Sequence, residues 1–409
     1  MAKKLANGVV VSIDIGTTKI CVIVARASHE HDIEILGVGR APSDGLRKGV
    51  VVDIGKTVES IKRAVKEAEF ISGHTIETAV VGISGSHIKS FNSHGAVPIK
   101  NNEVRKTDMS AALTAARAVS IPEGQQILHV LPQYFTIDNQ DRVVNPLGMF
   151  GVRLSVEAHV ITGSIASVQN IIQCCQMAGV QVSDIVLEQL ASAHAVLTQD
   201  ERELGVSVLD IGGGTSDFAL YSHGTIRYTM VLPVAGNHFT NDIAIGLQTT
   251  LREAERIKQN YGLACCKELL EEDIAVHTIQ GDQTKMIKQS YLAKIIEPRA
   301  HELLSIVHKE VERLELSHYM TTGLVLTGGG ALLNGMVDLA QDIFNVPVRI
   351  GKPQVPHVMP ESLNSPIYST GYGLLLHAIY NQSHGMGELD GPLVARIFFR
   401  MKSWISDFF

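Results

Sequence analysis

The chain has few cysteines, few aromatic side chains and no long apolar or basic run. Its 409 residues include five cysteines, and aromatic residues make up 5% of the total. The cysteines form no C-x-x-C spacing, so neither a zinc site nor a disulfide framework is predicted. No run approaches the roughly 18 apolar residues that a membrane span needs. The formal net charge of −7, with no long basic run against it, argues against nucleic acid as a partner.

These absences leave a cytoplasmic, globular protein as the expectation. The first residues, "MAKKLANGVVVSIDIG", enter a strand without a cleavable apolar segment, so we do not expect secretion. An apolar content of 45% is ample for the cores of several compact units. Strands near 155–162 and 180–187 alternate with helices near 165–178 and 189–198, which is typical of α/β layers.

The stretch "VLDIGGGTSDFALY", residues 208–221, interrupts a buried strand with three glycines between two aspartates. Glycine costs backbone entropy and offers no side chain to pack, so a close approach to the backbone is predicted here. Turns with exposed N–H groups bind anions, and an aspartate beside a phosphate holds the water shell of Mg²⁺. From this motif alone, a glycine-rich hairpin between two core strands remains an alternative.

The same pattern occurs twice, about 200 residues apart by the numbering. Residues 10–25, "VVSIDIGTTKICVIVA", and residues 206–221, "VSVLDIGGGTSDFALY", both read as strand, Asp-Ile-Gly, a Gly/Thr turn and a second strand. A third cluster, "GLVLTGGGALLNG" at 323–335, reads as strand, three glycines and the start of a helix, which would bring a helix N-terminus near a ligand. Two lobes that face one another across a cleft are therefore predicted.

The order "DIGTTK", "DIGGGTSD", "TGGGALLNG" resembles the phosphate-1, phosphate-2 and adenosine motifs of the actin, Hsp70 and sugar-kinase superfamily. A narrower similarity is to the FtsA family of actin-like bacterial cell-division proteins. It rests on "ILHVLPQYFTIDNQ" with "NPLGMFGVRL" (127–154), on 197–217 and on "IIEPRAHELL" (295–304). The resemblance implies a two-lobed actin-like ATPase fold of α/β class. It also implies a small α+β insertion in the first lobe and a detached C-terminal amphipathic helix.

The resemblance implies roles for residues that match the motifs, with ATP and Mg²⁺ as cofactors. Asp14 and Asp210 would hold Mg²⁺ through its waters. The residues that would contact the phosphates are Gly16, Thr17, Thr18, Lys19, Gly212, Gly213, Gly214 and Thr215. Glu255 and Lys258 match a pair that contacts ribose and base, although their spacing alone is equally that of a solvated ion pair. The residues that would lie against the adenosine, where a Cβ would crowd the ligand, are Gly328, Gly329 and Gly330.

Glu188 is the candidate for orienting the hydrolytic water, because "VLEQLASAHAVL" (186–197) occupies the place of the connecting helix in actin-like relatives. A carboxylate at a helix start that favours the N-terminal dipole is the alternative. We therefore expect an ATP-binding switch with weak ATPase activity.

The resemblance also divides the chain and assigns partners. The expected units are the first-lobe base (1–88 and 162–198), an inserted subdomain (89–161), the second-lobe base (199–228 and 298–380), the upper second lobe (229–297), a linker (381–391) and an amphipathic helix (392–409). The insertion would contribute filament contacts with further copies of the chain and signalling to later division proteins. The upper second lobe would dock the C-terminal tail of the tubulin-like protein FtsZ.

The final segment, "GPLVARIFFRMKSWISDFF", holds the only Trp of the chain. On a helix, its apolar side chains fall within roughly 160°, with basic residues on the remaining arc. The residues expected to enter the membrane are Leu393, Ile397, Phe398, Met401, Trp404, Ile405 and Phe408. Such a helix is typical of attachment to an anionic membrane surface, and docking on the protein's own core is the alternative.

The expected location is the cytoplasmic side of the bacterial inner membrane, peripherally bound, at the division septum. A sugar kinase would also carry "DIGTT", but it would need a sugar pocket with a catalytic aspartate. An Hsp70-like chaperone would need a peptide-binding domain after the ATPase. Neither alternative accounts for the amphipathic C-terminus.

Overall fold

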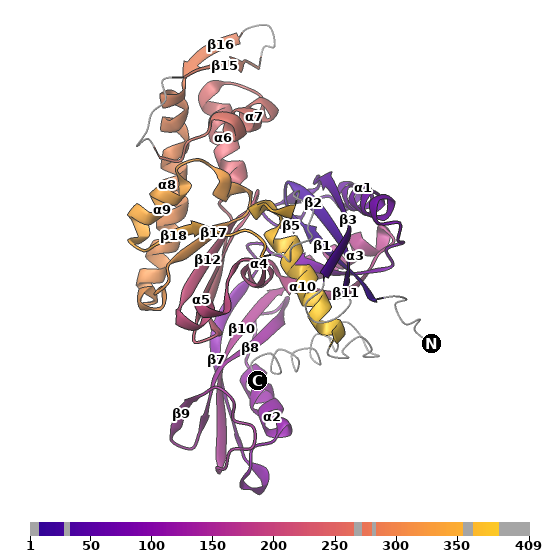
Figure 1. Ribbon diagram of the computed structural model, residues 1–409, viewed down its shortest axis with the longest axis vertical. Helices are drawn as coiled ribbons and strands as arrows, with labels where there is room; N and C mark the ends of the chain where they lie inside the picture. Colours follow the sequence, from indigo (N-terminus) through magenta and orange to yellow (C-terminus); the bar gives the residue numbers. More distant parts are fainter. Residues whose placement is uncertain (1–7, 28–32, 266–271, 280–283, 355–362, 384–409) are drawn as a thin grey trace.

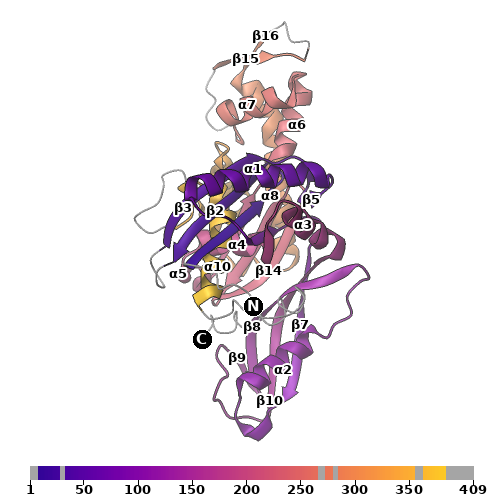
Figure 2. The ribbon, with the colours of Figure 1, turned by 90° about the vertical axis from the view of Figure 1, so that its right-hand side faces the viewer.

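The computed structural model describes residues 8–27, 33–265, 272–279, 284–354 and 363–383. In these ranges, two five-stranded sheets and one four-stranded sheet form three bodies (Figure 1). The sheets lie in two lobes side by side, and the four-stranded sheet extends beneath them (Figures 1 and 2).

The first lobe is built on a sheet with the strand order β11-β6-β1-β2-β3. Its strands are β1 (Val9–Ile15), β2 (Lys19–Ala27), β3 (Ile33–Pro42), β6 (Thr78–Ile83) and β11 (Gln181–Leu187). Every residue of β1 is buried because helices cover both faces of the sheet. These helices are α1 (Ile54–Ser72), α3 (Ile165–Met177), α4 (Glu188–Val196) and α10 (Ser369–Ser383), and a small hairpin, β4 (Leu46–Arg47) and β5 (Val50–Val51), precedes α1. Local signals set the ends of α1, since Asp53 caps its first turn and Gly73 ends it at φ 67°.

The second lobe repeats this plan with the strand order β14-β13-β12-β17-β18. Its strands are β12 (Val206–Ile211), β13 (Ser216–Ser222), β14 (Thr225–Leu232), β17 (Leu324–Thr327) and β18 (Val348–Ile350). Its helices are α5 (Gln199–Leu204), α6 (Gly236–Leu247), α7 (Leu251–Tyr261), α8 (Gln289–Arg313) and α9 (Met336–Phe344). The upper part consists of α6, α7, the first turns of α8 and a hairpin, β15 (Asp273–His277) with β16 (Thr284–Lys288).

The four-stranded sheet has the order β7-β10-β8-β9 and its own core beneath α2 (Lys106–Arg117). Its strands are β7 (Lys89–Pro98), β8 (Gln125–Ile137), β9 (Gln140–Val143) and β10 (Arg153–Ser164). The chain enters this sheet from β6 and leaves it into α3, so it is an insertion in the first lobe.

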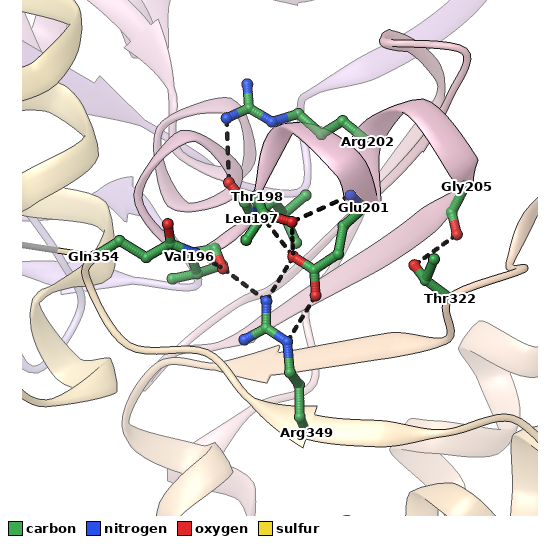
Figure 3. A network of polar contacts seen from close by, with 9 residues as sticks. All are labelled: Val196, Leu197, Thr198, Glu201, Arg202, Gly205, Thr322, Arg349 and Gln354. Carbon is green, nitrogen blue, oxygen red and sulfur yellow. Dashed lines mark hydrogen bonds and ion pairs between the residues drawn. The ribbon is translucent and has the colours of Figure 1, made fainter.

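The crossing from α4 into the second lobe is held by Arg349 on β18 (Figure 3). Its guanidinium makes two 2.8 Å hydrogen bonds to the carboxylate of Glu201 and a third, also 2.8 Å, to the backbone oxygen of Val196. Glu201 in turn caps α5 together with Thr198. Arg349 therefore binds both sides of the loop between the lobes, at the end of α4 and in the first turn of α5.

Several expected boundaries fall inside continuous elements. The boundary after 161 lies in β10, the one after 228 in β14, and the one after 297 in α8, which continues through Pro298. Helix α10 also covers 381–383 of the expected linker. Hydrogen bonding within a strand or helix does not stop where one subdomain gives way to the next, so a border between subdomains can fall inside one element.

The expected C-terminal helix at 392–409 lies outside the described residues, as do the membrane-contacting positions predicted within it. In the part of the chain that the structure describes, no helix combines the length and apolar character needed to cross a membrane.

Candidate functional site

A cavity of about 1450 Å³ opens between the two lobes. Every residue predicted to bind cofactor or metal or to act in catalysis lines it: Asp14, Gly16, Thr17, Thr18, Lys19, Glu188, Asp210, Gly212, Gly213, Gly214, Thr215, Glu255, Lys258, Gly328, Gly329 and Gly330. These residues come from both lobes and span more than 300 positions of the chain. Folding thus brings the three glycine motifs to one place.

The two Asp-Ile-Gly hairpins have the same turn geometry. In the first, the Gly16 N–H donates to the Lys19 carbonyl at 3.0 Å, and in the second the Gly212 N–H donates to the Thr215 carbonyl at 3.0 Å. The turns also touch each other, because a Cβ on Gly213 would lie 2.4 Å from the Thr18 methyl carbon. Glycine is therefore required here by the opposing turn, in addition to any ligand.

The third glycine cluster is tightly packed against protein atoms. A Cβ on Gly328 would lie 2.2 Å from the Asp210 carboxylate, and one on Gly330 would lie 2.3 Å from the Ile211 side chain. Packing within the protein therefore already excludes side chains at these two positions. At Gly329 the nearest atom, on Ile367, is 3.7 Å from such a Cβ.

The expected helix does not begin directly at this cluster. A short 3-10 turn, Gly329–Leu332, follows the strand, and α9 begins only at Met336. Gly335, at φ 77°, separates the two because a left-handed residue cannot continue a helix. No α-helix N-terminus therefore starts at the glycines themselves.

Buried carboxylates meet at the centre of the cavity. Asp14 forms an ion pair with Lys19 at 3.0 Å, and Asp210 accepts hydrogen bonds from Ser192 at 2.5 Å and Thr370 at 3.0 Å. Burial raises the pKa of Asp210 despite these two donors. Within the described residues, no three His, Cys, Asp or Glu side chains are arranged to hold a metal ion directly.

Glu188 begins α4 at the floor of the cavity. Burial raises the pKa of this carboxyl well above its usual range, and the nearby charges of Asp14 and Asp217 raise it further. The nearby charge of Lys19 acts in the opposite direction. Gly82 leaves room for the side chain, since a Cβ there would lie 3.2 Å from the Glu188 Cγ.

Sequence analysis missed the role of Asp217 and of its hydrogen-bond partner Ser84. Asp217, the second aspartate of "DIGGGTSD", is buried and lines the cavity. Burial raises its pKa to about 7, although a 2.5 Å hydrogen bond from Ser84 of the first lobe opposes that rise. The motif contained Asp217, but no local pattern links it to Ser84, 133 residues away.

Glu255 and Lys258 form a half-buried network instead of a solvated surface pair. They lie 2.7 Å apart, and the Lys258 amine also donates to the Gly236 carbonyl at 3.1 Å and to Thr240 at 2.9 Å. The Gly236 N–H donates to the Gly212 carbonyl at 2.9 Å. The pair is thereby connected to the second hairpin.

Solved structures with this arrangement define the fold class. The chain resembles the PilM-PilN type IV pilus biogenesis complex, with a TM-score of 0.65 at 18% identity over 90% of this chain and 98% of that one. It also resembles MreB5 of Spiroplasma citri bound to ADP, with a TM-score of 0.57 at 16% identity over 92% and 99%. Two α/β lobes around a cleft with paired Asp-Ile-Gly hairpins place the protein in the actin-like ATPase fold class.

The sequence comparisons identify the family within that class. A family model described as "Cell division protein FtsA" matches residues 207–373, and one described as "SHS2 domain inserted in FTSA" matches residues 85–162. The cell division protein FtsA of Pseudomonas aeruginosa is 44% identical over 99% of both chains. That of Bacillus subtilis (strain 168) is 39% identical over 92% of this chain and 84% of its own. The chain belongs to the FtsA family of cell-division proteins.

Proposed function

We propose that this protein binds Mg-ATP in the interlobe cavity and works as an ATP-dependent, actin-like membrane tether in bacterial cell division. The observation that carries the proposal is the pair of opposed hairpins, which line one cavity from both lobes and touch each other. Two MreB5 structures of Spiroplasma citri support it, since they were solved with ADP and with AMPPNP bound.

In this proposal the two hairpin turns hold the phosphates between them. Lys19 would neutralise phosphate charge, and Asp14 and Asp210 would accept hydrogen bonds from waters of a bound Mg²⁺. A divalent cation would also stabilise the ionised forms of the carboxylates that lie close together in this cavity. Lys19 is the amine that lies beside them. Glu255 and Lys258 also line the cavity and would contact ribose and base, and Gly328, Gly329 and Gly330 would lie against the adenosine.

Glu188 would orient or deprotonate the attacking water. Burial and the neighbouring carboxylates raise its pKa, which would make it a stronger base than an ordinary carboxylate. We expect weak ATPase activity, which suits a switch whose ATP state must persist.

The assembly function rests on the family and on the sequence of the last residues. We infer that the chain polymerises with further copies of itself at the cytoplasmic membrane and docks the FtsZ C-terminal tail. We also infer that it recruits later division proteins to the septum. Leu393, Ile397, Trp404 and Phe408 would anchor one copy weakly, and polymerisation would multiply the weak anchors by avidity.

Sedimentation with anionic liposomes tests these elements together. We expect the full chain to pellet with liposomes, more so with Mg-ATP, and to carry FtsZ into the pellet. Asp210→Ala should lose the ATP response and keep residual lipid binding. Pelleting that is independent of ATP in both proteins would contradict the nucleotide part. A supernatant that retains FtsZ would contradict the tether.

A further inference from the structure

The inserted subdomain contacts the lobe to which it is not covalently attached. Its strands leave and re-enter the first lobe, yet β7 and β8 lie against β14, the edge strand of the second-lobe sheet (Figure 2). An edge strand presents unpaired backbone groups that must find partners. Here the insertion supplies them.

The contact is a buried polar seam. Ser90 donates to the Thr229 carbonyl at 2.9 Å, and the Gln133 amide donates to the carbonyls of Ile226 at 2.9 Å and Arg227 at 3.2 Å. His159 lies 2.9 Å from the Thr229 hydroxyl and is 1% exposed. We call these contacts between the insertion and β14 the β14 seam. Buried donors and acceptors of this kind cost free energy when they have no partner. We therefore expect the β14 seam to be either closed or opened so far that water reaches these groups.

The backbone of the insertion is shaped to make this contact. In the pairing of β8 with β10, Tyr134 faces Glu157 and Pro132 faces Ala158, so Gln133 is the extra residue of a β-bulge. A bulge turns a side chain away from its usual direction, and here it directs Gln133 to β14. The adjacent Tyr134 ring lies 5.8 Å from the Arg227 guanidinium, which also lies 5.7 Å from the ring of Tyr319 in the second lobe.

The seam is connected to the cavity on both sides. From the first lobe, Ser84 lies in the segment between β6 and β7 and donates to Asp217 in the cavity wall. In the second lobe, Asp217 on β13 pairs with Val231 on β14, two residues from Thr229. If one hairpin moves relative to the other, the Ser84–Asp217 hydrogen bond, the position of β14, or both must change.

We propose that the insertion straps the two lobes together at the β14 seam, and that strap closure and nucleotide binding stabilise each other. This inference rests on the proposed nucleotide binding. The seam is closed in the same structure in which the Gly213 and Thr18 turns touch, so a ligand that holds both turns favours the closed seam. By linkage, closure of the seam must favour nucleotide by the same factor by which nucleotide favours closure, so a variant that opens the seam must bind nucleotide more weakly.

The test measures nucleotide affinity and backbone protection in the full chain. In the wild type, Mg-ATP should slow amide hydrogen exchange in β7 and β14. Gln133→Ala and Thr229→Val, one on each side of the seam, should each raise the Kd for a fluorescent ATP analogue about 5-fold. Thr229→Val keeps the side-chain shape and guards against a folding defect in Gln133→Ala. The matched control is Gln140→Ala, an exposed glutamine on β9, which should bind as the wild type does.

Unchanged affinity in both seam variants would overturn the strap, whatever the exchange pattern. Exchange in β7 and β14 that does not respond to bound nucleotide would overturn it as well. A wild type that binds no Mg-ATP would instead contradict the proposed function, and the strap with it.

Discussion

At the residue scale, the cavity concentrates carboxylates that water would ordinarily keep apart. Burial raises the pKa values of Glu188, Asp210 and Asp217. Lys19 forms an ion pair with Asp14 in the same cavity. Such a cluster costs stability when its members are ionised, and a bound cation would relieve that cost. The arrangement is consistent with the proposed Mg-ATP site.

Asp210→Ala should weaken binding of a fluorescent ATP analogue in the presence of Mg²⁺. Removal of a charged hydrogen-bond acceptor at the metal shell predicts a loss of about 2 kcal/mol, or roughly 30-fold in Kd. Gly213→Val should also prevent binding, because its side chain would collide with Thr18 and hold the turns apart. The control is Asp200→Ala, at an exposed aspartate on α5. Wild-type affinity in both site variants would refute the assignment.

Glu188→Gln should slow phosphate release about 100-fold while ATP binding stays within twofold of the wild type. The amide keeps the shape of the side chain and loses the basic oxygen. Because the pKa of Glu188 is raised, wild-type hydrolysis should increase with pH as this group ionises, and the variant should lose that dependence. Glu123→Gln, on the surface of the insertion, is the control. An unchanged hydrolysis rate would return Glu188 to a structural role.

At the element scale, two helices decide how the lobes meet. Helix α4 runs from the first lobe into the second, and α10 crosses it at Gly373, where a Cβ would lie 1.8 Å from the Ala191 carbonyl oxygen. The Ser12 hydroxyl on β1 donates to the Gly371 carbonyl at 2.8 Å. The crossing therefore requires glycine at position 373, because the backbones of α4 and α10 are too close there to leave room for a side chain.

Gly373→Ala should lower the free energy of unfolding by about 3 kcal/mol, since overpacking forces two helices apart. Gly55→Ala is a matched control in α1, where a Cβ has no atom nearer than 3.5 Å. That change should be neutral or raise stability by about 0.5 kcal/mol. Thermal unfolding followed by circular dichroism separates the two, and equal effects would refute the close crossing.

Arg349→Met should lower the free energy of unfolding at pH 7 by about 1 kcal/mol, because both partners of its ion pair are partly exposed. Burial acts to raise the pKa of Glu201, but Arg349 and the Thr198 cap lower it overall. A carboxylate with a depressed pKa contributes stability above its unfolded pKa and loses it as pH falls through the folded value. The difference between the wild type and the variant should therefore shrink below about pH 4.

Denaturant unfolding at pH 7 and pH 3 checks this pH dependence. Arg313→Met is the comparison, since it removes a more exposed pair with Glu310 on α8 and should have a smaller effect. A gap between wild type and Arg349→Met that widens in acid would contradict the assignment of Glu201.

At the scale of the whole molecule, several contacts join the two lobes. Helix α4 and the Arg349 contacts form one connection, and the hydrogen bond from Thr370 on α10 to Asp210 forms another. The Ser84–Asp217 hydrogen bond and the β14 seam add contacts at and beside the insertion.

Deletion of residues 393–409, or Trp404→Glu with Phe408→Glu, should abolish co-sedimentation with anionic liposomes and leave nucleotide affinity unchanged. Two charges on the apolar arc oppose insertion at the headgroup boundary. Ser403→Glu with Ser406→Glu, on the polar arc, is the matched control and should retain more binding. A truncated chain that pellets with lipid as the full chain does would refute the membrane anchor.

Local sequence determined the hairpins, the helix ends and the α/β class. "DIGTTK" and "DIGGGTSD" specify the same turn, because the glycine and threonine positions set the backbone regardless of the rest of the chain. Asp53 and Gly73 mark the ends of α1 in the same local way. The motif order also pointed to the family, which the relatives confirm.

Tertiary structure decided what each of these residues touches. At Gly328 and Gly330, side chains are excluded by Asp210 and Ile211, which lie more than 100 positions earlier in the chain. The Ser84–Asp217 bond and the β14 seam likewise join segments with no shared pattern in the sequence. Packing across long sequence separations sets burial, pKa and contact, whereas backbone periodicity and turn chemistry act only on neighbours along the chain.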